Sequence, residues 1–260
     1  MNEQPPTNRN QFQTPYASNP ARPAVPGGEV LRPAATPSAL GVKPDARLAN
    51  AFLSQAFLWM FAGLLVTAGI AFVVQSNPKL LQFAEGNFFL LFIAQLAIVM
   101  VIAGAINRIS ATTALALFFV YAATLGITIG LIVASYTTGS VVTAFLSASA
   151  MFGAAAVYGK VTHRSLARLG GILFMGLIGL FVAMILNIFL ASSAITWLIS
   201  IVGVVLFTAL TAYDVQRIQS GDIAAQTGSM EKAAVIGALQ LYLDFINLFL
   251  FMLRLMGGRS

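Results

Sequence analysis

Cysteine is absent from the 260-residue sequence, and histidine occurs once, at His163. Without cysteine the chain has no disulfide, no thiolate nucleophile and no cysteine-ligated zinc or iron–sulfur site. One histidine is too few for a histidine-rich metal centre. The sequence also contains no phosphate-binding glycine loop and no serine nucleophile elbow. We therefore expect neither an enzyme nor a bound cofactor.

Charge is also scarce, since charged residues make up 8% of the chain and about 25% of an average soluble domain. Hydrophobic residues make up 58%, and the mean hydropathy is +0.87. A water-soluble protein of this size needs more polar groups than this to cover its surface. The composition therefore predicts an integral membrane protein. The net charge of +6 is not clustered in the sequence, so we expect no nucleic-acid partner.

Proline is concentrated at one end of the chain, with nine of its ten residues in the first 44 positions. Asparagine, glutamine, serine, threonine and glycine surround these prolines, a composition typical of disorder. We predict a disordered tail over residues 1–48 and a membrane domain over residues 49–260. The first apolar run is too long for a cleaved signal peptide, so we expect it to remain as a helix.

The rest of the chain contains long apolar segments of roughly 17–25 residues, the length that crosses a hydrocarbon core of ~30 Å. They are continuously apolar rather than alternating, which excludes a transmembrane β-barrel. We therefore predict an all-α integral membrane protein with a seven-helix bundle. The seven segments are 52–74, 87–107, 112–134, 141–159, 169–190, 195–213 and 233–255.

Lysine and arginine are unevenly divided between the two ends of these segments, with 11 on the side of the tail and three on the other. Because basic residues accumulate on the cytoplasmic side, we predict a cytoplasmic N-terminus and an outside C-terminus. Small residues such as Gly126 and Gly130 recur within the segments. They favour tight packing within a monomer over a dimer interface.

The last segment contains an ionisable residue, Asp244, whose burial in lipid costs ~2.5–3.5 kcal/mol. At 100° per residue, Asp244 shares one side of the helix with Gly237, Gln240, Asn247 and Phe251. For Gln240 and Asn247 we favour hydrogen bonding between helices. For Asp244 we favour a function, because an ionisable group within a span is functional by default.

A second acidic residue, Asp214, ends the sixth segment, and Arg217 lies three positions later on the same helix. An ion pair between these two side chains is one interpretation. The other is a pair of carboxylates, because Asp244 reaches the depth of Asp214 if the last helix enters the membrane near Leu241. The two aspartates would then be neighbours on antiparallel helices.

Two neighbouring carboxylates in a low-dielectric site cannot both ionise cheaply, so they share one proton and titrate as a unit. Such a pair is a pH switch, because deprotonation adds a buried negative charge that separates the helices or attracts a cation. Hard oxygen ligands suit calcium, so we expect a transient cation contact at Asp214 and Asp244 rather than a resident metal. Arg108 is the candidate counter-charge, although a topology signal in a short loop explains it equally well.

Three stretches of the sequence carry a family resemblance. They are Met151-Phe-Gly with Tyr158-Gly-Lys-Val-Thr-His-Arg-Ser-Leu166, Ala212-Tyr-Asp-Val-Gln-Arg-Ile218, and Leu239-Gln-Leu-Tyr-Leu-Asp-Phe-Ile-Asn-Leu-Phe-Leu250 with Leu253-Arg-Leu255. From about residue 50 onward the chain resembles the bacterial branch of the Bax inhibitor-1/YccA family, also called the transmembrane Bax-inhibitor-motif family.

The resemblance implies six helices around a central last helix, in the inner membrane of a bacterium. It also implies a pH-sensitive calcium leak channel with calcium as the transported ion. In that interpretation Asp214 and Asp244 form the pH sensor, and Arg108 matches the basic residue that closes the pore. A glutamate found in the second helix of some members has no counterpart here, where Gln95 is the nearest polar residue.

The family also suggests functions of other classes. Some bacterial relatives resemble substrates and modulators of a membrane-bound AAA protease, so the chain could act by binding that protease instead of conducting ions. Deleting residues 1–48 distinguishes the two, because a regulator should lose its effect and a channel should keep its flux. A third alternative is a packing-only scaffold in the lipid bilayer, in which both aspartates are structural.

Overall fold

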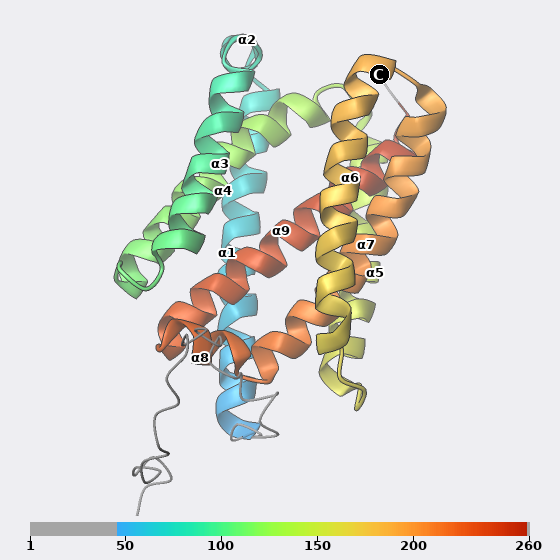
Figure 1. Cartoon of the computed structure of the whole chain (residues 1–260). Helices are drawn as coiled ribbons and strands as arrows, with labels where there is room; N and C mark the ends of the chain where they lie inside the picture. The colour runs from blue at the N-terminus through green and yellow to red at the C-terminus, as the bar shows by residue number, and fades with distance from the viewer. Residues whose placement is uncertain (1–45, 259–260) are drawn as a thin grey trace, which may run out of the picture. The chain divides into compact units, whose positions relative to one another are not determined.

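The structure, a computed structural model, describes residues 46–258. This part of the chain is helical, and Figure 1 shows its helices in chain order. Their bounds are α1 Ala46–Gln75, α2 Pro78–Gly86, α3 Phe88–Ala105, α4 Ala111–Val133, α5 Thr138–Val161, the 3₁₀ helix η1 Ala167–Leu169, α6 Gly170–Leu190, α7 Ser193–Gln219, α8 Asp222–Thr227 and α9 Met230–Met256.

Seven of the helices are long and apolar enough to cross a membrane, namely α1, α3, α4, α5, α6, α7 and α9. They correspond one to one with the predicted segments, so the predicted seven-helix bundle is confirmed. Two ends differ by six residues: α1 begins at Ala46 where the prediction began at residue 52, and α7 continues to Gln219 where the prediction ended at residue 213. Asp214 therefore lies within the helix. Residues 1–45 of the predicted tail lie outside the described residues.

Two short helices, α2 and α8, occupy segments that the apolar pattern left as loops. Asn77 caps α2, because its side-chain oxygen accepts hydrogen bonds from the backbone nitrogens of Lys79 at 3.0 Å and Leu80 at 3.4 Å. Pro78 is the first residue of the helix, a position where its missing N–H is not needed. The Asn-Pro pair is thus a helix-start signal that hydropathy alone does not detect.

The last long helix, α9, is central in the bundle. In its most apolar stretch 67% of the residues are buried, against 11% in each of the peripheral helices α3 and α6. α9 packs against α1, α4, α5, α7 and α8, whereas α3 packs mainly on α4 and α6 on α7. Figure 1 shows α9 crossing the middle of the bundle. The predicted central position of the last helix is confirmed.

Glycine allows α1 and α4 to approach closely. A Cβ atom at Gly126 would lie 2.9 Å from the carbonyl oxygen of Thr67, and one at Gly130 would lie 2.8 Å from that of Ala71. Both obstacles are backbone atoms of α1, which cannot move aside without shifting the helix. These two glycines therefore serve packing within the chain, as small residues do between helices in lipid.

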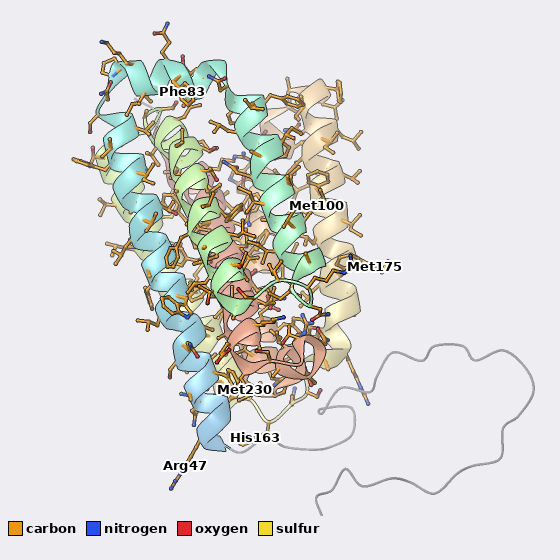
Figure 2. All side chains as sticks on the ribbon, turned by 90° about the vertical axis from the view of Figure 1, so that its left-hand side faces the viewer. Arg47, Phe83, Met100, His163, Met175 and Met230 are labelled. Carbon is orange, nitrogen blue, oxygen red and sulfur yellow. The ribbon has the colours of Figure 1, made fainter. Side chains whose placement is uncertain are left out.

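Figure 2 shows the two ends of the bundle in a side view. Arg47 at the start of α1, His163 after α5 and Met230 at the start of α9 lie at one end, and Phe83 of α2 lies at the other. The basic loop around His163 is therefore at the same end as the start of α1. This is the arrangement on which the predicted cytoplasmic N-terminus depends.

Candidate functional site

The structure brings Asp214 and Asp244 together on two helices that pack against each other, α7 and α9. Both side chains are buried, with 7% of Asp214 and 4% of Asp244 exposed. They are close enough for their charges to interact directly. Because so little of either side chain is exposed, both carboxylates are enclosed by protein.

The contacts between α7 and α9 follow an antiparallel register. Gly237 approaches the Ile218 side chain, and a Cβ atom there would lie 3.0 Å from it. Two turns further along α9, Asp244 lies close enough to Asp214 for their charges to interact. Two more turns along, the Phe251 ring packs 5.8 Å from the ring of Phe207. The face of α9 expected from helical periodicity is thus the face that packs on α7, and we call it the Asp244 face.

Two oxygen atoms on the Asp244 face are buried without a hydrogen-bond donor among the described residues. They are Oδ2 of Asp244 and Oε1 of Gln240, which lie one helical turn apart, on the same side of α9. A buried acceptor without a donor is unfavourable. A proton on Asp244 or a cation between the oxygens would relieve this cost, so this position is suited to bind either.

Asn247, the third polar residue of this face, is already satisfied. Its Nδ2 atom donates to the carbonyl oxygen of Leu243 at 2.8 Å, within α9 itself. This hydrogen bond is within α9 and does not join it to a neighbouring helix. We had expected Asn247 to form a hydrogen bond between helices. Gln240 and Asn247 thus differ, although the sequence pattern placed them in the same stripe.

Arg217 does not form the ion pair with Asp214 that its spacing suggested. Its Nη2 atom instead donates to Oε1 of Gln226 in α8 at 2.8 Å, and no ion pair with Asp214 occurs in the part of the chain that the structure describes. The positive charge of Arg217 is still close enough to act on Asp214. Asp214 is therefore influenced by one negative charge from α9 and one positive charge from its own helix.

Arg108 is not brought to the aspartates. It lies exposed in the turn between α3 and α4, and its side chain makes no contact with Asp214 or Asp244 within residues 46–258. The neighbouring Asn107 accepts a hydrogen bond through its carbonyl oxygen from Nζ of Lys232, at 3.5 Å. The α3–α4 turn is thus linked to the start of α9, and the gating role of Arg108 stays a prediction.

The opposite face of α9 carries a buried hydroxyl chain that the sequence reasoning missed. Thr67 of α1 donates through Oγ1 to the carbonyl oxygen of Ala122 in α4 at 2.9 Å. The Tyr242 hydroxyl lies 2.5 Å from the same Oγ1, so Tyr242 is the donor in that bond. The ring of Tyr242 packs edge-on against Phe118 at 5.4 Å and Tyr121 at 6.0 Å. We call this side the Tyr242 face.

Gln95 has a structural role. Its Nε2 atom donates to Oγ1 of Thr128 at 2.7 Å and to the carbonyl oxygen of Thr124 at 3.1 Å. These bonds attach the peripheral helix α3 to α4. Gln95 therefore contributes to helix packing, away from the aspartate pair.

The described residues contain no group of three or more histidine, cysteine or acidic side chains that could hold a metal ion. Calcium takes 6–8 oxygen ligands in stable protein sites. Asp214, Asp244 and Oε1 of Gln240 supply too few oxygens for a resident ion. They suit the brief contact of a cation that passes by.

Comparison with known proteins gives related sequences over nearly the whole described part of the chain. A family model described as "Inhibitor of apoptosis-promoting Bax1" matches residues 49–260. The inner membrane protein YbhL of Escherichia coli K12 is 39% identical over 224 residues, which cover 84% of this chain and 95% of YbhL. An uncharacterized protein of Borreliella burgdorferi is 41% identical over 222 residues, covering 84% of this chain and 96% of that protein.

Proposed function

The chain belongs to the Bax inhibitor-1 family of membrane proteins, and we propose that it is a pH-sensitive cation leak channel that passes calcium. Its gate is the pair Asp214 and Asp244. The name of its relative YbhL supports a location in a bacterial inner membrane. Most basic residues are on the side of the membrane domain where Arg47 and His163 lie. This distribution supports a cytoplasmic N-terminus and an outside C-terminus.

One observation carries this proposal: two buried carboxylates lie on the packed helices α7 and α9, close enough for their charges to interact. A pair of this kind holds a proton at low pH, because two adjacent negative charges are unfavourable away from water. Buried ionisable groups of membrane helices occur mainly along ion pathways and proton relays. The pair therefore suits a channel that responds to protons better than a packing-only role.

In the proposed mechanism a shared proton keeps α7 and α9 packed together at low pH. When the pH rises and the proton leaves, the second negative charge repels Asp214 from Asp244. The helices separate, and a cation is attracted to the carboxylate oxygens. Flux is therefore expected to increase with pH.

Charged groups near the pair modify this response. Arg217 lies near Asp214 on the same helix, α7, and its positive charge acts on the pair. Arg108, at the turn between α3 and α4, is the proposed counter-charge that closes the pore in the protonated state. That role requires the turn to move toward the pair, because Arg108 is exposed and does not contact it.

Calcium flux into proteoliposomes tests the proposal. The full-length chain is compared between about pH 6 and pH 8 with Asp214→Asn plus Asp244→Asn. Glu85→Gln serves as a matched control, because it removes an exposed carboxylate of α2. We expect flux that rises with pH in the parent and in the control, and flux without pH dependence in the double variant.

The proposal is wrong if the parent passes no more calcium than empty liposomes at any pH. The family alternative, regulation of a membrane AAA protease by binding, would then be tested by deleting residues 1–48. Flux that keeps its pH dependence in the double variant would instead leave the channel in place and remove the aspartate pair as its sensor.

A further inference from the structure

A long groove lies on the outer surface of the bundle between α1 and α5. α1 packs on α4, α7 and α9, and α5 packs on α7 and α9, whereas α1 and α5 make few contacts with each other, among them that of the rings of Phe57 and Phe152. Two adjoining cavities of about 470 Å³ and 270 Å³ lie between these two helices. They share wall residues from all three helices, Leu64 and Ala68 of α1, Phe145 of α5 and Phe245 of α9. Together they form one continuous groove, which we call the α1–α5 groove.

The groove is about as long as the hydrocarbon core of a bilayer is thick. Its α1 wall runs from Leu53 at one end to Gln75 at the other, which corresponds to ~33 Å of helix at 1.5 Å per residue. The hydrocarbon core is ~30 Å thick. The exposed side chains of Phe61 and Leu65 stand at its edge. A lipid chain in the surrounding bilayer therefore has direct access to it.

The floor and walls of the groove are mainly apolar and aromatic. Phenylalanine rings from α1, α5 and α9 meet edge to face along it, at centroid distances between 5.5 and 6.4 Å. Such a surface binds hydrocarbon through shape and dispersion. The rings concerned are Phe57, Phe152, Phe245, Phe145 and Phe249.

One end of the groove is polar and positive. Ser54 of α1 and Lys160 in the last turn of α5 both line that end. Lys160 is exposed and forms no ion pair or hydrogen bond through its side chain with any residue in 46–258. Arg164 and Arg168 follow in the same loop. The other end is bordered by the neutral Gln75, so the positive charge is at one end only.

We propose that the α1–α5 groove binds an anionic phospholipid. The phosphate lies at Lys160 and Ser54, and one acyl chain extends along the phenylalanine rings toward Phe249. Basic pockets between membrane helices recognise anionic headgroups in this way, and the apolar groove adds the burial of the chain. The site does not involve the aspartate pair, and the inference is independent of the proposed channel activity.

Thermal unfolding of the purified full-length chain in detergent tests the site. A ligand that binds the folded state raises the unfolding temperature in proportion to its affinity and concentration. Phosphatidylglycerol is the anionic probe, phosphatidylcholine the zwitterionic one, and glycerol 3-phosphate supplies the phosphate without a chain. We expect a saturable increase with phosphatidylglycerol, a smaller one with phosphatidylcholine and none with glycerol 3-phosphate.

Two pairs of variants locate the binding. Gly153 lines the groove, and a Cβ atom there meets nothing within 4 Å, so the side chain of Gly153→Leu starts in open space and occupies part of the groove. Gly179→Leu on α6 is its control, because that glycine also faces open space, away from the groove. Lys160→Gln removes the charge at the groove end, and Arg168→Gln removes a charge of the same loop that does not line the groove.

We expect Gly153→Leu to abolish the response to phosphatidylglycerol and Gly179→Leu to keep it. Lys160→Gln should weaken the apparent affinity for phosphatidylglycerol about fivefold, because one basic residue near anionic lipid contributes ~1 kcal/mol. Arg168→Gln should bind phosphatidylglycerol about as well as the parent. Equal responses to the two lipids, or equal responses in the two glycine variants, would overturn the proposal. A response to glycerol 3-phosphate alone would do so too, because it would show a free phosphate site instead of a lipid site.

Discussion

The two faces of α9 differ in how their buried polar groups are paired. On the Tyr242 face, the hydroxyls of Tyr242 and Thr67 and the carbonyl of Ala122 form a complete chain across three helices. On the Asp244 face, Oδ2 of Asp244 and Oε1 of Gln240 have no donor among the described residues. Both faces belong to one rigid helix. The buried polar groups between α9 and the helices α1 and α4 are thus paired, while those on the Asp244 face are left for the proposed proton or cation.

The comparison explains why a proton can have a large effect at one contact only. A satisfied network gains nothing from a new proton, whereas an unpaired carboxyl oxygen becomes a hydrogen-bond donor when it is protonated. In the proposed mechanism α9 therefore has a fixed side and a responsive side. Variants on the Tyr242 face should change the stability of the protein. Variants on the Asp244 face should change its response to pH.

Removal of the Tyr242 ring has the largest expected effect on stability. Tyr242 is fully buried, and Tyr242→Ala leaves a cavity against Phe118 and Tyr121, which costs about 3–5 kcal/mol. The measurement is the free energy of unfolding in an SDS titration. Tyr242→Phe is the control, because it keeps the ring and should cost only about 0.5–1.5 kcal/mol. Equal losses in both variants would show that ring packing is unimportant here.

Thr67→Val should have an intermediate effect. The variant keeps the shape of the side chain and leaves the Tyr242 hydroxyl without its acceptor, at a cost of about 1–3 kcal/mol. Thr67→Ser retains the hydroxyl and serves as its control. The same titration, together with the pH dependence of calcium flux, checks both variants. A pH response that changes in Thr67→Val but not in Thr67→Ser would contradict the separation of the two faces.

At high pH, where Asp244 carries no proton, Gln240→Met should have the smallest effect on stability, a gain of up to about 1 kcal/mol, because it removes a buried oxygen that then has no donor. The substitution also removes Oε1 of Gln240, the acceptor one helical turn away to which a protonated Asp244 could donate. The protonated state is then less favourable, so flux should begin at a lower pH. Asn247→Leu is the matched control, since the Asn247 amide bonds within its own helix. An equal shift of the pH response in both variants would refute the role assigned to Gln240.

The parts of the fold that depend on single-helix periodicity could be predicted. The length of the apolar segments determines the spans, and the 100° spacing places Gly237, Asp244 and Phe251 on one side of α9. The pairing with Asp214 also follows, because consecutive spans are antiparallel and Asp244 reaches the depth of Asp214 when the last helix enters the membrane near Leu241. The α2 helix was missed because its Asn77 cap is a local hydrogen-bond signal within a polar loop.

Contacts that depend on the packing of distant helices could not be predicted. The Thr67–Tyr242 bond joins residues 175 positions apart, and many threonine side chains in the spans are equivalent candidates. The role suggested for Arg108 depends on the distance between a short turn and the helix core, which spacing in the sequence does not determine. The α1–α5 groove arises because α1 and α5, which are not consecutive, make few contacts with each other. Hydropathy contains no information on such a gap.

The central claim, that Asp214 and Asp244 share one proton, is tested most directly by infrared difference spectroscopy of the protein in liposomes. A neutral carboxylic acid has its own C=O absorption. We expect one such band that disappears over the pH range in which calcium flux begins, and that is absent from the variant with Asp214→Asn and Asp244→Asn. A spectrum without a pH-dependent acid band, or a band that persists in the double variant, would contradict the account.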